Sequence, residues 1–182
     1  QAEKNSELNF KINAEAPATI AKETKKLDAH LIHYSTDYVF EGSGTHFQQE
    51  SETPRPINKY GEAKLLGERS IEASGVSSTI LRTSWVFSPH GTNFLKSMIK
   101  LGMERETLCI VADQIGAPTS ARLLAEVTES IMYHFSQKNR NGSKCDLFHL
   151  VCDGEASWYD FANEIFKVAR AQGLSLKLKE LR

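Results

Sequence analysis

Tyr60 and Lys64 are the two residues whose types and spacing could do chemistry together. They stand four positions apart in a stretch with a helical pattern, so their side chains lie on one face of the predicted helix. A phenol is a weak acid, with an ordinary pKa of about 10, and a nearby ammonium lowers that pKa by stabilising the phenolate. We therefore expect Tyr60 to protonate the alkoxide that forms when a carbonyl receives hydride, while Lys64 also holds a ribose hydroxyl of a dinucleotide cofactor.

A second polar element, Ser35-Thr36-Asp37, supports this interpretation. Roughly 0.4 Tyr–Lys pairs at this spacing are expected by chance in such a chain, so the pair alone could be an ordinary surface pair. The second element, however, is placed where the strand expected at 31–36 ends, and open parallel sheets bind ligands beyond the carboxyl ends of their strands. The alternative is that these residues only satisfy a turn. Because the two elements occur together, function is the preferred interpretation.

The rest of the sequence alternates between helical and strand patterns. Helices are expected at 13–27, 59–73, 93–102, 120–136 and 157–171, and strands at 31–36, 78–87, 107–112 and 146–151. Ser157, with Asp160 three positions later, is a cap pattern for the last helix. Residues 41–58 are rich in Gly, Ser, Thr and Pro and should form an irregular loop. Strands separated by helices need crossover connections, so the predicted fold class is α/β, with a parallel sheet covered on both faces.

Charge and cysteine content exclude several classes of protein. The 22 basic and 23 acidic residues nearly balance and form no block of like charge, so we expect neither nucleic-acid nor membrane binding. Cys109, Cys145 and Cys152 are odd in number and lack Cys-x-x-Cys spacing, which argues against disulfides and a zinc site and favours the cytoplasm. His30 and His33 should lie on opposite faces of a strand as packing or surface residues, and we expect no metal site.

Six motifs, in order along the chain, carry a resemblance to one family. They are STDYVFEG, PxxxYGEAK, LRTSWVF, Asn93-Phe94, DQIGAPTSA and SWYDFA. Over residues 13–171 the sequence resembles the dTDP-4-dehydrorhamnose reductases of the extended short-chain dehydrogenase/reductase superfamily. The resemblance implies the C-terminal portion of a Rossmann-like, doubly wound sheet with a small substrate-binding α/β part. It also implies reduction of dTDP-4-dehydrorhamnose to dTDP-L-rhamnose, a polysaccharide precursor, with NADPH (or NADH) as cofactor.

The resemblance also implies roles for individual residues. Thr36 would polarise the ketone, Tyr60 would be the proton donor, and Lys64 would anchor the nicotinamide ribose and lower the pKa of Tyr60. Ser35 would lie beside the nicotinamide. The substrate side would be formed by Asp37, Tyr38, Trp85 and Asn93, together with the loop 113–119.

Two aromatic positions in the second half of the sequence have a structural alternative. Trp85 lies in an apolar strand pattern, where a tryptophan can belong to the core instead of a substrate site. Trp158 and Tyr159 open an amphipathic helix, and we expect them to pack within the protein.

The sequence contains no glycine-rich turn of the kind that holds a dinucleotide pyrophosphate at a helix N-terminus. We therefore expect most of the cofactor site to lie upstream of Gln1, in a longer reductase of which this chain is the C-terminal part. Residues 1–182 alone should show little or no reductase activity. Residues 1–88 would form the second half of the NAD(P)-binding domain. Residues 89–182 would form mainly the substrate-binding part, with some segments returning to the Rossmann sheet.

Two other functions share these motifs. A nucleotide-sugar epimerase or dehydratase has the same Thr, Tyr and Lys, but dehydration needs a further acidic residue, and Tyr38 occupies its position. The other alternative is a non-catalytic relative that accompanies methionine adenosyltransferase as a regulatory subunit. The intact Thr36, Tyr60 and Lys64 argue against that alternative, and the lack of a glycine-rich turn argues for it. The exact sugar, the preference for NADPH over NADH, and the oligomeric state, a homodimer included, stay open.

Overall fold

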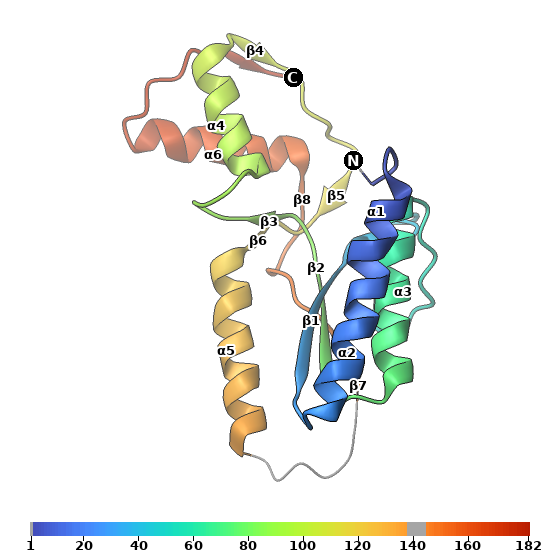
Figure 1. The fold of residues 1–182 in the computed structure, drawn as a ribbon. Coiled ribbons are helices and arrows are strands. Elements are labelled where there is room, and N and C mark those ends of the chain that lie inside the picture. The colour runs from blue at the N-terminus through green and yellow to red at the C-terminus, as the bar shows by residue number, and fades with distance from the viewer. Residues whose placement is uncertain (1, 138–144) are drawn as a thin grey trace. The chain divides into compact units, whose positions relative to one another are not determined.

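The computed structural model describes residues 2–137 and 145–182. They group into two compact units, formed by residues 2–83 with 127–137 and 145–150, and by Ser84–Glu126 with Val151–Arg182. Figure 1 shows the elements of both units, coloured along the chain. The domain division expected near residue 88 stays a prediction.

Three parallel strands form the sheet of the first unit. Their order is β1 (Leu31–Thr36), β2 (Ser78–Thr83) and β7 (Cys145–His149). The register pairs Thr36 with Thr83 and Arg82 with His149, so the three strands end at the same edge of the sheet. The expected fold class, α/β with a parallel sheet, is confirmed.

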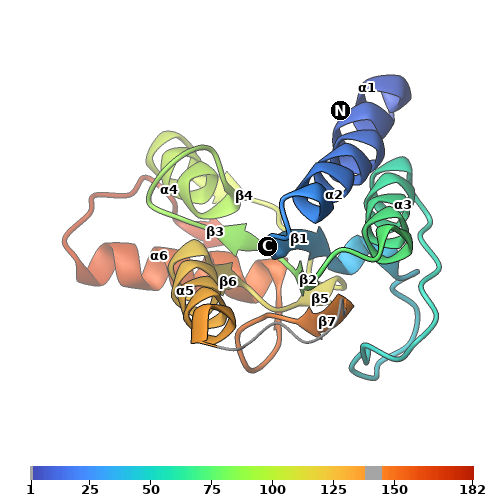
Figure 2. The same cartoon turned by 60° about the horizontal axis from the view of Figure 1, so that its bottom comes forward.

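Helices cover both faces of this sheet. The helices α2 (Ala16–Lys26) and α3 (Lys59–Ser74) lie on one side, and residues 127–137 of α5 (Ala121–Gln137) lie on the other (Figure 1, Figure 2). The apolar core between sheet and helices contains Ala21, Ile71, Val76 and Ile80. Removing these side chains from water is the main source of the unit's stability.

The N-terminal helix is longer than expected. A first helix, α1 (Ser6–Phe10), begins at Asn5, whose side chain accepts a hydrogen bond from the backbone of Leu8 at 3.1 Å. A π-helical turn, Lys11–Glu15, then joins α1 to α2. The expected start at residue 13 is therefore wrong, because the cap residue that begins this helical segment lies eight positions earlier.

The helix α3 agrees with the expected 59–73 and begins close to the end of β1. Asn58 caps it by accepting a hydrogen bond from the backbone N–H of Gly61 at 2.8 Å, and Gly75 ends it. A Cβ atom at Gly61 would lie only 2.1 Å from the carbonyl oxygen of Tyr38. Glycine at this position therefore lets the first turn of α3, which carries Tyr60, approach the residues that follow β1.

The single strand expected at 78–87 is broken in the structure. After β2 ends at Thr83, Trp85 adopts a left-handed backbone conformation with φ of 46°. A separate short strand, β3 (Val86–Phe87), then pairs with β6 (Thr119–Ser120). A continuous β-branched and aromatic run conceals such a break, because only the backbone angle of one residue interrupts it.

The second unit is built on two helices, α4 (Phe94–Glu104) and α6 (Trp158–Ala171). Its core consists of Met98, Leu108, Ala162, Ile165, Phe166 and Leu178. Two further pairs of short strands belong to this unit: β4 (Thr107–Leu108) with β9 (Glu180–Leu181), and β5 (Ile115–Gly116) with β8 (Ala156–Ser157).

Most of the remaining sequence-based expectations agree with these elements. The helices expected at 93–102, 120–136 and 157–171 are α4, α5 and α6 within two residues at each end. The predicted cap at Ser157 is confirmed, because its hydroxyl accepts from the backbone of Asp160 at 3.0 Å. The strand expected at 107–112 is only the two-residue β4. Within the described part of the chain, no helix has the length and apolar character needed to cross a membrane.

Candidate functional site

Thr36 is the last residue of β1 and stands at the carboxyl edge of the sheet. It is buried, with 6% of its surface exposed. Its hydroxyl donates a hydrogen bond to the carboxylate of Asp37 at 3.0 Å and accepts one from the backbone N–H of Tyr38 at 3.3 Å. The turn role considered from the sequence is therefore present, and it holds the hydroxyl in a defined place.

Tyr60 reaches this hydroxyl from the first turn of α3. The side chain of Thr36 acts on the phenol of Tyr60 and partly lowers its pKa. Its ring also meets the ring of Tyr38 edge-on, with centroids 5.9 Å apart. Tyr60 is 36% exposed, so its ring is packed on one side and accessible on the other. The structure therefore brings together four of the predicted site residues: Thr36, Asp37, Tyr38 and Tyr60.

Lys64 lies one helical turn after Tyr60 and is almost fully buried, with 8% of its surface exposed. Its ammonium donates to the backbone carbonyl of Tyr34 at 2.6 Å and lies 3.3 Å from Nε2 of His33. Burial lowers the pKa of Lys64, while the charge of Glu68 acts in the opposite direction. Lys64 is thus anchored to β1 just before the strand reaches Thr36.

The expected lowering of the Tyr60 pKa by Lys64 is not found in the structure. The pKa of Tyr60 is raised, chiefly by burial and further by the charges of Asp37 and Tyr38, while the hydrogen bond with Thr36 lowers it in part. The physical reason is that the Lys64 ammonium points to acceptors on β1. A raised pKa keeps Tyr60 protonated at neutral pH, which is the form a proton donor needs.

Asp37 is the second titratable group at the end of β1. Its pKa is raised, mainly by burial, although hydrogen bonds from Thr36 and from the backbone of Asp37 and Tyr38 act against the shift. Tyr38 is 48% exposed. Asp37 and Tyr38 both contact Thr36, and Tyr38 also contacts the ring of Tyr60, so the four residues form one small polar cluster.

Two buried hydroxyls at the carboxyl edge lack partners among the described residues. They are Oγ of Ser35 in β1 and Oγ1 of Thr83 in β2. A buried polar atom without a hydrogen bond costs stability, so its presence calls for an explanation. At Ser35, a ligand group at the end of the strand would supply one, and this fits a residue expected beside a nicotinamide.

Three polar residues near Lys64 were not recognised as part of the site from the sequence. His33 was interpreted as a packing or surface residue, whereas its Nε2 lies 3.3 Å from the Lys64 ammonium. Glu68 and Arg82 form a buried ion pair with a shortest distance of 2.6 Å. The spacing of Tyr60, Lys64 and Glu68 along one helix face, and a charge within an apolar strand, were the available signals.

The predicted residue Trp85 lies in the second unit. Its ring stacks on Trp158 with a centroid distance of 3.5 Å and an angle of 9° between the planes. Phe94 packs against Trp158 at 4.5 Å. The left-handed backbone of Trp85 is a strained conformation for a large side chain, and such strain concentrates at functional sites.

Asn93, also in the second unit, is engaged within its own loop. Its side chain caps α4 by accepting from the backbone of Lys96 at 3.2 Å and donates to the carbonyl of Ser88 at 2.7 Å. These bonds hold the start of α4. A contact of Asn93 with a substrate stays a prediction.

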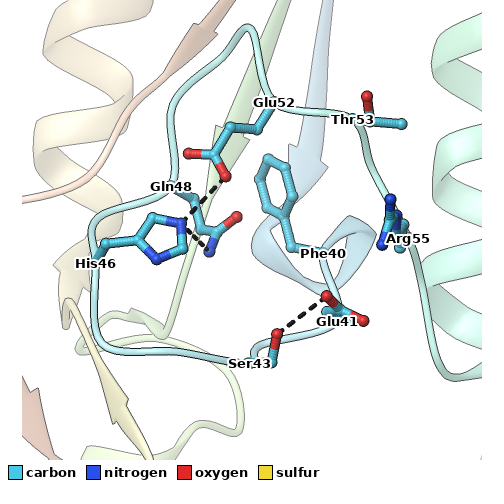
Figure 3. Close-up of a pocket in the computed structure, with 8 residues that line it drawn as sticks. All are labelled: Phe40, Glu41, Ser43, His46, Gln48, Glu52, Thr53 and Arg55. Atoms are coloured by element: carbon cyan, nitrogen blue, oxygen red, sulfur yellow. Dashed lines mark hydrogen bonds and ion pairs between the residues drawn. The ribbon is translucent and has the colours of Figure 1, made fainter.

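The loop that follows the β1 turn encloses a small polar hollow of about 280 Å³ (Figure 3). The hollow is lined by Phe40, Glu41, Ser43, His46, Gln48, Glu52, Thr53 and Arg55. Several of these side chains are hydrogen-bonded to one another. His46 contacts Glu52 at 3.2 Å, and Ser43 donates to Glu41 at 3.0 Å (Figure 3). We interpret the hollow as a consequence of how this loop folds on itself.

Similarity to known proteins extends over the whole chain. The family model described as RmlD substrate binding domain matches residues 1–181. The dTDP-4-dehydrorhamnose reductase of Escherichia coli K12 is 42% identical over 182 residues, which are 100% of this chain and 60% of that protein. The corresponding enzyme of Salmonella typhimurium LT2 is 41% identical, with the same coverage of 100% and 60%.

A solved structure shows the same fold. The crystal structure of dTDP-4-dehydrorhamnose reductase from Bacillus anthracis, in complex with NADP, matches with a TM-score of 0.88 and 36% identity, over 100% of this chain and 60% of that one. The chain thus spans about 60% of the length of its relatives. With a family model that matches nearly every residue, the chain belongs to the RmlD substrate binding domain family.

Proposed function

We propose that the full-length protein carrying these residues reduces the ketone of dTDP-4-dehydrorhamnose to the alcohol of dTDP-L-rhamnose, with NADPH as the hydride source. One observation carries the proposal: the Tyr60 phenol interacts with the side chain of Thr36 at the carboxyl end of β1, one helical turn from the buried Lys64. The family relationship supports the same reaction, because the similar proteins from Escherichia coli and Salmonella typhimurium are named for it.

Thr36 and Tyr60 act on the ketone oxygen in this mechanism. The Thr36 hydroxyl polarises the carbonyl by donating to its oxygen in place of the carboxylate of Asp37, to which it now donates. Tyr60, protonated at neutral pH, transfers its proton to the same oxygen as negative charge develops there.

NADPH, when bound, supplies the hydride that the carbonyl carbon receives. Lys64 would hold a hydroxyl of the nicotinamide ribose. Oγ of Ser35, which has no hydrogen-bond partner among the described residues, would bind a polar group beside the nicotinamide. The structure of the Bacillus anthracis reductase in complex with NADP supports this choice of cofactor. The pyrophosphate would be held by residues other than these 182, because they contain no glycine-rich turn. By themselves they should therefore show little or no turnover.

Asp37, Tyr38, Trp85 and Asn93 are proposed to contact the sugar nucleotide. Tyr38 also distinguishes the proposed reductase from a dehydratase. Its phenol, with the ring 5.9 Å from that of Tyr60, replaces the acidic residue that dehydration would need. A reductase consumes NADPH in step with its product, whereas an epimerase consumes none.

The proposed location is the cytoplasm, where the three free cysteines Cys109, Cys145 and Cys152 suit a reducing environment. A homodimer is the assembly to be tested, by light scattering on the full-length protein.

The test is to incubate the full-length protein with NADPH and dTDP-4-dehydrorhamnose and to quantify both NADPH and the sugar products. We expect one NADPH oxidised for each dTDP-L-rhamnose formed. A change in the sugar without NADPH oxidation would favour an epimerase or dehydratase. Binding without any turnover would favour the regulatory alternative.

A further inference from the structure

The ammonium of Lys64 is held by two acceptors on β1. It donates to the carbonyl of Tyr34 at 2.6 Å and contacts Nε2 of His33 at 3.3 Å. An ammonium has three N–H donors and no acceptor, so Nε2 of His33 accepts in this contact. The two bonds use two of the three donors and leave one for a further partner.

The imidazole of His33 has the protonation state that this contact requires. Burial, and then the charge of Lys64, lower the pKa of His33 to about 4, while Glu68 acts in the opposite direction. A neutral imidazole carries a single N–H, so when Nε2 accepts, the proton lies on Nδ1. At neutral pH His33 is therefore an uncharged acceptor for Lys64.

The charge of Lys64 is oriented without being cancelled by a carboxylate. Glu68 lies four residues after Lys64, a spacing at which helical ion pairs form. Both of its carboxylate oxygens, however, accept hydrogen bonds from Arg82, at 3.0 Å and 2.6 Å. A carboxylate bound directly to Lys64 would oppose its field, whereas the carbonyl of Tyr34 and the imidazole of His33 are neutral.

We infer that His33 is a positioning residue, which holds Lys64 against β1 so that the remaining N–H can bind a ribose hydroxyl. This inference rests on the proposed function and deepens it by one residue. The effect of His33 on turnover runs through Lys64. If His33 served only as packing, an apolar side chain of similar size would replace it without loss.

Two substitutions of His33 separate these roles in the full-length protein. His33→Gln places an amide oxygen where Nε2 accepts, and His33→Leu removes the acceptor. His46→Gln and His46→Leu, at an exposed histidine of the surface loop, are the matched controls. We measure kcat, KM for NADPH, their pH profiles and the melting temperature of each variant.

His33→Leu should raise KM for NADPH and lower kcat, each about tenfold, and should shift the pH profile, because Lys64 loses one of its two anchors. For His33→Gln, kcat and KM for NADPH should stay within about threefold of the wild-type values, and for both His46 variants within about twofold. Both changes are smaller than the loss of one charged hydrogen bond would cause. A folded His33→Leu protein with wild-type kinetics would overturn the inference. So would a His33→Gln protein as impaired as His33→Leu.

A measurement on the wild-type protein tests the inference without relying on turnover or on the folding of the variants. In ¹⁵N NMR spectra at neutral pH, His33 should carry its proton on Nδ1, with Nε2 unprotonated. A proton on Nε2 would overturn the inference even if the reductase reaction is found. An inactive wild type with the expected His33 spectrum would instead reject the proposed function and leave the contact with Lys64 established.

Discussion

Arg82 on β2 donates two hydrogen bonds to the carboxylate of Glu68 on α3, from Nε to Oε1 at 3.0 Å and from Nη2 to Oε2 at 2.6 Å. Both side chains are buried, each with 5% of its surface exposed. The guanidinium also lies over the ring of Phe40, 5.1 Å from its centroid. This ion pair fastens the helix that carries Tyr60 and Lys64 to the middle strand of the sheet.

Removing one partner of this pair should destabilise the protein strongly. Glu68→Leu and Arg82→Met each leave a buried charge without compensation, which costs about 3–5 kcal/mol of the free energy of unfolding. The double variant should be more stable than the sum of the two changes predicts. Urea unfolding measures all three, with Glu164→Gln in an exposed ion pair as control. Single variants within about 1 kcal/mol of the wild type would show that the pair behaves like a surface one.

Gly61→Ala should lower kcat by more than its loss of stability can explain. The new Cβ would lie 2.1 Å from the carbonyl oxygen of Tyr38, so α3 must move and take Tyr60 away from Thr36. A displacement of this kind can lower kcat about 100-fold. Gly67→Ala is the matched control, because its Cβ would lie 2.4 Å from the carbonyl oxygen of Asn13, on another part of the helix. Equal kcat in two folded variants would contradict this view of Gly61.

His33 should make stability depend on pH. Its pKa is lowered from 6.5 to about 4, chiefly by burial, so between these pH values the unfolded chain binds a proton that the folded protein does not. Stability is therefore lost as the pH falls through this window, by at most about 3 kcal/mol. His33→Gln should flatten this part of the curve in urea unfolding across the same window. Identical slopes for variant and wild type would show that other groups are responsible.

Residues 1–182 alone should bind NADPH at least about 100-fold more weakly than the full-length protein, a difference of about 2.8 kcal/mol. The reason is that Ser35 and Lys64 can contact only the nicotinamide end, while the sequence has no glycine-rich turn for the pyrophosphate. Isothermal titration of both polypeptides measures the difference. Equal affinities would mean that these residues hold the whole cofactor.

Much of the fold was predictable from the sequence because long periodic segments determine their own elements. The helices α3, α5 and α6 combine an apolar face with recognisable ends, such as the Ser157 cap. The break at Trp85 and the two-residue strands of the second unit were not predictable. They depend on one backbone angle and on pairing between distant segments, which leave no periodic pattern in the sequence.

The candidate site was predictable from the sequence where its residues lie close together along the chain. Thr36, Asp37 and Tyr38 are consecutive, and Tyr60 and Lys64 share a helix face, so short spacings place them. The contacts of Lys64 with His33 and of Glu68 with Arg82 join different elements. The pKa of Tyr60 also differs from the expectation, because burial and the direction of the Lys64 side chain are properties of the folded protein.

The most direct test of Tyr60 as the proton donor is the rate of NADPH oxidation by the Tyr60→Phe variant of the full-length protein with dTDP-4-dehydrorhamnose. This change removes only the phenol oxygen, and Tyr133→Phe, at an exposed position, is the control. We predict that kcat of Tyr60→Phe falls about 100- to 10,000-fold, the usual contribution of a positioned acid, while Tyr133→Phe keeps the wild-type rate. A folded Tyr60→Phe protein that oxidises NADPH at the wild-type rate would contradict the account.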